Sequence, residues 1–122
     1  MGIILSICDE HALRLHRRNL LKSEGYDVIS VPSSKEVLTA FEDNDLDLVI
    51  VCHSLPLSLK HRLCSFFKFK RPLTPVLVFR CATERQSESV QADGFIDQDQ
   101  ENGFLPLVKS LARRGGTRYA TA

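Results

Sequence analysis

Five short runs rich in apolar and β-branched residues, each followed by a longer segment, constrain this fold more than any other feature. The runs cover residues 3–7, 26–31, 46–51, 74–79 and 94–96. In the third run, Leu48 to Val51 are four apolar residues in a row, which is typical of a strand buried on both faces. The strand–helix order repeats five times. This order predicts an α/β protein with a doubly wound, five-stranded parallel sheet and helices on both faces.

The segments between the runs carry apolar residues at helical spacing. In the first segment, Leu13, Leu15, Leu20 and Leu21 predict one apolar side of a helix that ends before Gly25. The paired Arg17 and Arg18 are then expected on its solvated surface. In the second segment, "SSKE" at 33–36 has the spacing of a capping box. The segment 57–70 predicts a third helix, and the residues from 105 onward predict a last one.

Length and charge narrow the class of protein. The chain has 122 residues, which suits one domain, and a formal net charge of +1. Such a small net charge gives no general attraction to nucleic acid or to a membrane surface. Its longest apolar stretches are far shorter than a membrane span, and no secretory leader is visible. We therefore expect a cytoplasmic protein whose four cysteines are reduced.

Polar and sulfur-containing residues follow the predicted strands at their carboxyl ends. In doubly wound sheets the functional crevice lies beyond these ends, near the point where the strand order reverses. The residues concerned are Cys8-Asp9-Glu10, Cys52-His53, Arg80-Cys81 and Asp97-Gln98. We expect the functional residues of this chain to come from this set.

Four stretches of the sequence resemble the receiver domains of two-component response regulators. They are "ILSICDEHALR", "EGYDVISVPSSKEVLTAFEDNDLDLVIVCHSLP", "TPVLVFRCA" and "ADGFIDQDQ", in the family's order and spacing. The resemblance implies the CheY-like, flavodoxin-like topology with strand order 2-1-3-4-5. It runs from about Ile4 to Ala112. We therefore assign residues 1–114 to a receiver-like domain and residues 115–122 to a flexible tail.

In the family, an aspartate at the end of the third strand accepts a phosphoryl group, and two acidic residues after the first strand hold Mg²⁺. Counting back from the loop residue Pro56, the resemblance places Cys52 at the acceptor position. The two acidic positions fall on Cys8 and Asp9, and Glu10 follows them. Only Asp9 keeps the family's residue type, so the pocket that the resemblance implies is degenerate.

The remaining family positions are also altered. The hydroxyl position after the fourth strand is Arg80, the lysine position after the fifth is Gln98, and the aromatic switch position is Phe95. Phosphoryl transfer of this kind depends on a metal and fixed charges, and a thiol is a poor ligand for Mg²⁺. We expect no phosphorylation by the usual mechanism, no catalytic residue, no metal and no cofactor. We further expect Arg80 to replace the missing positive charge by pairing with Asp9 or Glu10.

Three cysteines are expected to meet at one crevice. Cys8, Cys52 and Cys81 follow strands that are neighbours in this topology, whereas Cys64 lies within a predicted helix and is interpreted as a core residue. The three thiols suit small space-filling side chains, a redox switch with a Cys8–Cys52 disulfide, or a soft-metal site that includes His53. No metal-binding spacing of cysteines and histidines favours the metal site.

The expected function is that of a receiver-like, bacterial signalling module that binds a protein partner without being phosphorylated. We expect no nucleic acid or membrane partner, and a monomer or weak homodimer. The segment 81–91 is about one helical turn shorter than in the family, which predicts a shortened fourth helix and an altered partner surface. The alternatives are a thiol-based redox or soft-metal sensor, a flavodoxin-like cofactor carrier, and a phosphorelay protein that uses Asp9 or Asp97.

Overall fold

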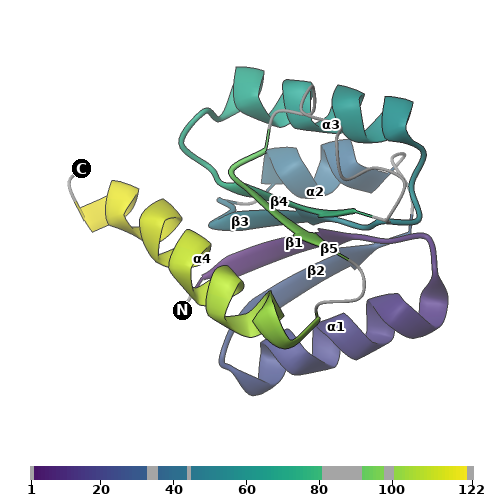
Figure 1. The fold of residues 1–122 in the computed structure, drawn as a ribbon. Helices are drawn as coiled ribbons and strands as arrows, with labels where there is room; N and C mark the ends of the chain where they lie inside the picture. Colours follow the sequence, from purple (N-terminus) through teal and green to yellow (C-terminus); the bar gives the residue numbers. More distant parts are fainter. Residues whose placement is uncertain (1, 33–35, 44, 81–91, 98–100, 121–122) are drawn as a thin grey trace.

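The computed structural model describes residues 2–32, 36–43, 45–80, 92–97 and 101–120. Its centre is one parallel five-stranded sheet with the order β2-β1-β3-β4-β5 (Figure 1). The strands are β1 (Ile3–Ile7), β2 (Asp27–Val31), β3 (Leu48–Val51), β4 (Val76–Arg80) and β5 (Gly94–Asp97). This topology confirms the predicted fold class and strand order.

Helices cover both faces of the sheet. The helices are α1 (His11–Ser23), α2 (Val37–Asp43), α3 (Leu57–Lys70) and α4 (Phe104–Ala120), and the 3₁₀-helix η3 (Glu101–Gly103) precedes α4. Helices α2 and α3 lie on one face, and α1 and α4 lie on the other (Figure 1). Two buried apolar clusters correspond to these two layers. The sheet is therefore buried on both faces, as the apolar sequence of β3 predicts.

Side chains along the central strands point alternately to the two helical layers and so contribute to both halves of the core. Leu5, Val49 and Val78 belong to the cluster under α2 and α3, whereas Ile4, Ile50 and Phe79 belong to the cluster under α1 and α4. Successive side chains of a strand point to opposite faces, so each central strand contributes to both clusters. The strand ends that carry the candidate site are thereby fixed on a rigid support.

The bounds of the elements agree with the sequence in most places. Helix α1 ends at Ser23, and Gly25 takes a positive φ of 93°, the conformation that favours glycine after a helix. Leu15 is an exception to the predicted apolar side, because 43% of it is exposed. Helix α4 continues to Ala120, beyond residue 114, where the sequence predicts a flexible tail. The residues 33–35 of the proposed capping box and the shortened helix proposed at 81–91 lie outside the described residues.

No helix in the described ranges combines the length and the apolar character that crossing a membrane requires.

Candidate functional site

The carboxyl ends of β1 and β3 bring two cysteines together. The strands pair in register, with Ile7 opposite Val51, so Cys8 and Cys52 are the next residues on adjacent strands. The Cys8 Sγ donates a hydrogen bond to the Cys52 Sγ at 2.7 Å. Both residues are buried, with 1% and 0% of their surfaces exposed. The structure thus brings Cys8 and Cys52, two of the predicted site residues, into contact.

A polar rim connects this thiol pair to the surface. The Ser54 Oγ lies 3.2 Å from the Cys52 Sγ, and it also donates a hydrogen bond to the Asp9 carboxylate. Asp9 and Ser54 are exposed. Glu10 is exposed as well, and it contributes its backbone carbonyl, 3.7 Å from the Cys8 Sγ. The buried sulfur of Cys52 thus lies in contact with the hydroxyl group of an exposed residue, Ser54.

Arg17 of α1 is the main site residue that the sequence analysis missed. The sequence interpretation placed it on the solvated surface, but only 1% of it is exposed. Its Nη1 donates a hydrogen bond to the Cys52 Sγ at 3.4 Å, and its guanidinium carbon lies 3.6 Å from the centre of the Phe79 ring. The sequence does carry a signal, because Arg17 lies four residues from both Leu13 and Leu21. Residues four apart share one face of a helix, so this face points to the core.

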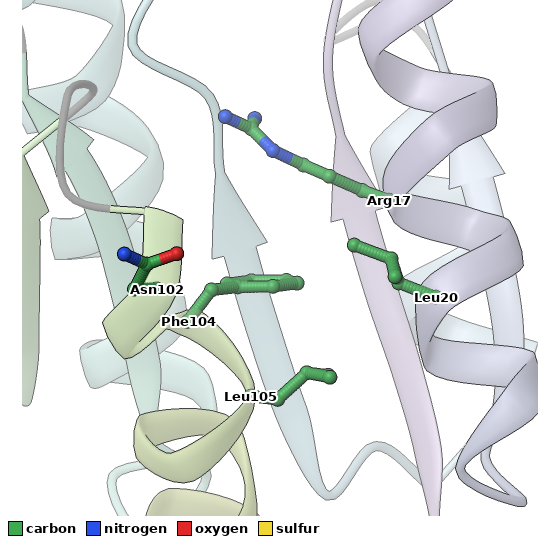
Figure 2. A pocket seen from close by; sticks show the side chains of 5 residues that line it. All are labelled: Arg17, Leu20, Asn102, Phe104 and Leu105. Carbon is green, nitrogen blue, oxygen red and sulfur yellow. The ribbon is translucent and has the colours of Figure 1, made fainter.

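Arg17 also forms part of the wall of a cavity between α1 and the start of α4. The cavity has a volume of about 330 Å³ and is lined by Arg17, Leu20, Asn102, Phe104 and Leu105. In Figure 2 the Arg17 side chain extends from α1 across the neighbouring strand, with its guanidinium directed away from Leu20 and Leu105. The stem of Arg17 thus borders the cavity, while its charged end reaches the thiol pair.

Arg80 has a different partner from the one that the sequence suggested. We expected it to pair with Asp9 or Glu10, but its Nη2 lies 3.2 Å from the Asp97 Oδ1. Arg80 and Asp97 are opposite each other in the β4–β5 register. The Arg80 guanidinium also lies 4.8 Å from the centre of the Phe95 ring. Among the described residues, Arg17 donates to a sulfur of the pair and Arg14 donates to the Cys8 carbonyl at 2.9 Å, whereas Arg80 pairs with Asp97 at the β4–β5 edge of the sheet.

Other predicted residues have simpler positions. Phe95, at the aromatic switch position, is partly buried against the core cluster under α2 and α3. Cys64 is fully buried in that cluster, which confirms its interpretation as a core residue, and burial raises the pKa of its thiol to about 12. Cys81 and Gln98 lie outside the described residues. Their predicted places in the crevice stay predictions.

A second buried cation was also missed. Lys60 of α3 is only 1% exposed, and its Nζ donates a hydrogen bond to the Phe79 carbonyl at 3.1 Å. Lys60 lies three residues before Leu63 and seven before Phe67, two buried residues of the same helix. This spacing again places a charged residue on the core-facing side of a helix. The carboxyl end of β4 is therefore held by a lysine from α3.

The pKa values of the two thiols are shifted in opposite directions. The hydrogen bond from the Cys8 thiol lowers the pKa of Cys52 to about 5, and Ser54 and the positive charge of Arg17 act in the same direction. The same hydrogen bond raises the pKa of Cys8, because its proton is held by the Cys52 sulfur, and burial adds to this effect. These opposite shifts favour a state in which Cys8 keeps its proton and Cys52 is the thiolate.

The same atoms are a poor site for a hard cation. Ligand atoms of Cys8, Asp9 and Cys52 lie within 4.8 Å of one another. However, two of the three are sulfurs, and Mg²⁺ prefers oxygen ligands in an octahedral arrangement. The guanidinium of Arg17 also lies against one of these sulfurs and repels a cation there. The arrangement favours a thiolate stabilised by an internal positive charge.

Comparisons with known proteins identify the fold. No protein-family model matches the chain, and no curated protein matches its sequence. The response regulator protein TrrA from Thermotoga maritima, solved in complex with Mg²⁺-BeF, superposes with a TM-score of 0.79 at 23% identity, covering 91% of this chain and 99% of TrrA. The signal receiver domain of a signal transduction histidine kinase from Syntrophus aciditrophicus gives a TM-score of 0.82 at 22% identity, covering 93% and 91%. The fold is that of a receiver domain.

Receiver folds also occur within longer proteins. NtrX from Brucella abortus, solved in complex with ADP, matches with a TM-score of 0.83 at 17% identity. The match covers 98% of the present chain but 28% of the NtrX chain. The receiver-like chain therefore corresponds in shape to one part of NtrX and to nearly the whole of TrrA.

Proposed function

We propose that this chain is a signalling module of the two-component type that binds a protein partner and is not phosphorylated by the aspartate–Mg²⁺ mechanism. The observation that carries the proposal is the thiol pair at the carboxyl ends of β1 and β3, with a buried arginine against it. By the sequence resemblance, Cys52 stands at the acceptor position and Cys8 at an acidic position of the receiver family. TrrA, by contrast, was solved with Mg²⁺-BeF.

The charge arrangement supports the loss of metal-dependent phosphorylation. Phosphoryl transfer is catalysed mainly by positioning and by neutralising the phosphoryl oxygens with a metal and fixed cations. Here the exposed Asp9 is the carboxylate beside the thiol pair, and it already accepts a hydrogen bond from Ser54. Arg17 occupies the inner side of the pair with a permanent positive charge. A divalent cation would meet one carboxylate, two sulfurs and a repelling guanidinium.

The partner is expected to be another protein of a signalling pathway. Receiver folds matched by this chain come from a response regulator and from a signal transduction histidine kinase. With phosphorylation absent, the remaining output of such a fold is recognition of its surface by another protein. We place this module in the bacterial cytoplasm, as a monomer or weak homodimer, without a nucleic acid or membrane partner.

Binding of Mg²⁺ and beryllofluoride is the direct test. The thermal unfolding of this protein should be unchanged when both are added, whereas TrrA, treated in parallel as the positive control, should be stabilised by a bound ligand. Incubation with acetyl phosphate should give no intact-mass increase of about 80 Da, the mass of a phosphoryl group. A Mg²⁺-dependent adduct, at Asp9, Asp97 or elsewhere, would contradict the proposal.

Partner binding can be tested separately from phosphorylation. Proteins that crosslink to the purified chain in an extract of its host should be the same before and after treatment with acetyl phosphate. Each captured protein should then bind the purified chain directly in a two-component titration. An interaction that appears only after phosphoryl-donor treatment would overturn the proposed mode of action. The absence of any direct binding partner would overturn the interaction itself.

A further inference from the structure

Two sulfurs and a buried guanidinium meet at one point of the fold. The Cys8 thiol donates to the Cys52 sulfur at 2.7 Å, and Arg17 donates to the same sulfur at 3.4 Å. A cysteine that only fills space needs no charged neighbour. A guanidinium that is 1% exposed requires compensating polar or anionic groups, and a thiolate at Cys52 is one such group. The arrangement therefore suits a reactive thiolate.

We infer that Cys8 and Cys52 form a reversible disulfide on exposure to hydrogen peroxide or a small alkyl hydroperoxide. Cys52 is the attacking thiolate, Cys8 is the resolving thiol, and Arg17 is a positioning residue that holds the charge on Cys52. This modification site goes beyond the proposed function, which depends on the absence of phosphorylation and on protein binding. A result that contradicts the disulfide would therefore leave the proposed function standing, and the reverse also holds.

The backbone geometry permits the bond. Cys8 and Cys52 directly follow the paired residues Ile7 and Val51, and the Cys52 N–H donates to the Ile7 carbonyl at 3.0 Å. Neighbouring parallel strands lie about 4.8 Å apart, which is within the usual Cα separation of disulfide-bonded cysteines. The sulfurs, already at 2.7 Å, need only a small side-chain movement to bond. No strand has to leave the sheet.

A small oxidant can reach the sulfur from the rim. The Cys52 Sγ is buried, but the Ser54 Oγ lies 3.2 Å from it and belongs to an exposed residue. We expect rotation of the Ser54 side chain away from Asp9 to give a small oxidant access to this sulfur. A peroxide is small enough to use this access, whereas a bulky alkylating reagent should react more slowly. Because the pair is buried, we expect small oxidants to react with it faster than bulky reagents do.

The chemistry balances in two steps. The Cys52 thiolate attacks the terminal peroxide oxygen and the O–O bond breaks; hydroxide leaves from hydrogen peroxide, or alkoxide from an alkyl hydroperoxide, and takes up a proton from solvent to give water or an alcohol. Cys52 is then a sulfenic acid, oxidised by two electrons. The Cys8 thiol loses its proton and attacks the Cys52 sulfur, the S–O bond breaks, and the hydroxide that leaves combines with that proton as water. A dithiol reductant reverses the oxidation by thiol–disulfide exchange.

The charged and titratable groups around Cys52 determine its pH response. Cys8, the residue after β1, donates a hydrogen bond to its sulfur, and Arg17 from α1 supplies a positive charge. The His53 Nδ1 lies 3.9 Å from the Cys52 Sγ, and Asp9 is linked to Cys52 through Ser54. The negative charge of Asp9 opposes the thiolate from a greater distance. The directly contacting groups therefore favour the charged form of Cys52.

Intact-mass measurement on the whole protein tests the disulfide. Peroxide should lower the mass by about 2 Da, and dithiothreitol should restore it. Digestion without reductant should yield a peptide pair joined through Cys8 and Cys52. A pair joined through Cys81 or Cys64, or no mass loss under conditions that oxidise free cysteine, would overturn the inference. Stoichiometric zinc that leaves both thiols unreactive would overturn it as well.

Single-cysteine variants assign the two roles. Cys8→Ala removes the hydrogen bond that lowers the pKa of Cys52, so it should react more slowly and stop at the sulfenic acid, with a gain of about 16 Da and labelling by dimedone at Cys52. Cys52→Ala should lose the rapid oxidation, and Cys64→Ala should behave as the wild type because Cys64 lies elsewhere in the core. Retained disulfide formation in either Cys8→Ala or Cys52→Ala contradicts the proposed pair. The peptide map of the wild type decides the question even if a variant fails to fold.

Arg17 is tested by the pH profile of the oxidation rate. Arg17→Met should slow oxidation about fivefold or more near neutral pH, and the loss should shrink at high pH where the thiol ionises without help. Arg18→Met changes the adjacent position on α1 and is the matched control, with an expected rate near that of the wild type. A uniform slowing at every pH would indicate a merely structural role and would contradict the assignment of Arg17.

Discussion

Three contacts on the Cys52 sulfur distinguish the two buried thiols, namely the Cys8 thiol, the Ser54 hydroxyl and the Arg17 guanidinium. Cys8 and Cys52 occupy equivalent positions on neighbouring strands, yet the Arg17 Nη1 donates a hydrogen bond to the Cys52 sulfur at 3.4 Å. A fixed positive charge next to one sulfur favours the negative charge on that sulfur. The Cys8 proton then bridges the pair. The hydrogen bond from Cys8, supported by Ser54 and by the charge of Arg17, thus makes Cys52 the more nucleophilic cysteine.

This asymmetry predicts how stability depends on pH. The hydrogen bond from Cys8 lowers the pKa of Cys52 from 9.0 to about 5, so the stabilisation it gives is fully present above pH 9 and is lost as pH falls through 5. The free energy of unfolding of the wild type minus that of Cys52→Ala should rise by at least about 1 kcal/mol between pH 5 and 9. Urea denaturation across this range measures it.

The raised pKa of Cys8 limits the rise of stability with pH at high pH. The pKa of Cys8 is raised by its hydrogen bond to Cys52, so the stabilisation from its bound proton is lost as pH rises further above 9. The stability difference should therefore pass through a maximum near pH 9. A difference that stays constant from pH 5 to 9 would show that no thiolate forms at Cys52.

Arg17 and Cys52 should be energetically coupled. The guanidinium of Arg17 is buried over the Phe79 ring and hydrogen-bonded to the Cys52 sulfur. A double-mutant cycle with Arg17→Met and Cys52→Ala should give a coupling free energy of about 1 to 2 kcal/mol near pH 8. At pH 4, where Cys52 is protonated, the coupling should fall. Chemical denaturation of the four proteins at both pH values provides the measurement.

The control cycle replaces Arg17→Met with Arg18→Met. Adjacent helix positions point in directions about 100° apart, so Arg18 cannot occupy the place of Arg17. Its coupling with Cys52→Ala should be close to zero at both pH values. Equal coupling in the two cycles would mean that a general effect of charge, and not the contact, links α1 to the site.

At the scale of elements, aspartates fix the amino ends of the central strands. The Asp47 Oδ2 accepts a hydrogen bond from the Ile3 N–H at 2.8 Å, and the Asp93 Oδ2 accepts one from the Val76 N–H at 2.8 Å. A side chain at Gly2 would meet the Asp47 Oδ2 at 2.6 Å, so glycine there permits the close approach. These contacts hold β1 and β4 in place at the edge opposite the thiol pair.

Removing the Asp47 contact should destabilise β1 without changing the chemistry of the site. Asp47→Ala leaves the partly buried Ile3 N–H without this acceptor and should lower the free energy of unfolding by about 1 to 2 kcal/mol. Asp47→Asn keeps an acceptor oxygen and is the matched control, with a smaller loss. Urea denaturation measures both variants. Equal losses in the two variants would indicate that the negative charge, and not the acceptor, matters.

The helices and strands were predictable because their apolar residues recur at the positions that face the core. Strand β1 and helix α3 have the bounds that the sequence predicts, Ile3–Ile7 and Leu57–Lys70. The site was less predictable. Arg17 and Lys60 are charged residues on core-facing sides of helices, and a reading that assigns charged residues to the surface misses both. The pairing of Arg80 with Asp97 depends on the β4–β5 register, which no single strand reveals.

For the whole molecule, a Cys8–Cys52 disulfide would join two central strands. The two cysteines are 44 positions apart, and α1, β2, α2 and β3 lie between them. A crosslink over a loop of this length removes conformational freedom from the unfolded chain, which corresponds to about 4 kcal/mol in the chain-entropy model. The folded chain changes little, because the two strands are already neighbours in the sheet. Oxidation should therefore act mainly on the unfolded state.

The oxidised protein should accordingly be more stable than the reduced protein. We expect its free energy of unfolding to be higher by about 2 to 4 kcal/mol, since measured gains are often below the entropic value. Denaturation with and without dithiothreitol measures the difference, and Cys64→Ala should show the same gain because that thiol is not part of the pair. Loss of the negative charge at Cys52 on oxidation works against the gain, because Arg17 then faces a neutral sulfur. Oxidised protein that is less stable than reduced protein would mean that the lost Arg17–thiolate contact outweighs the crosslink.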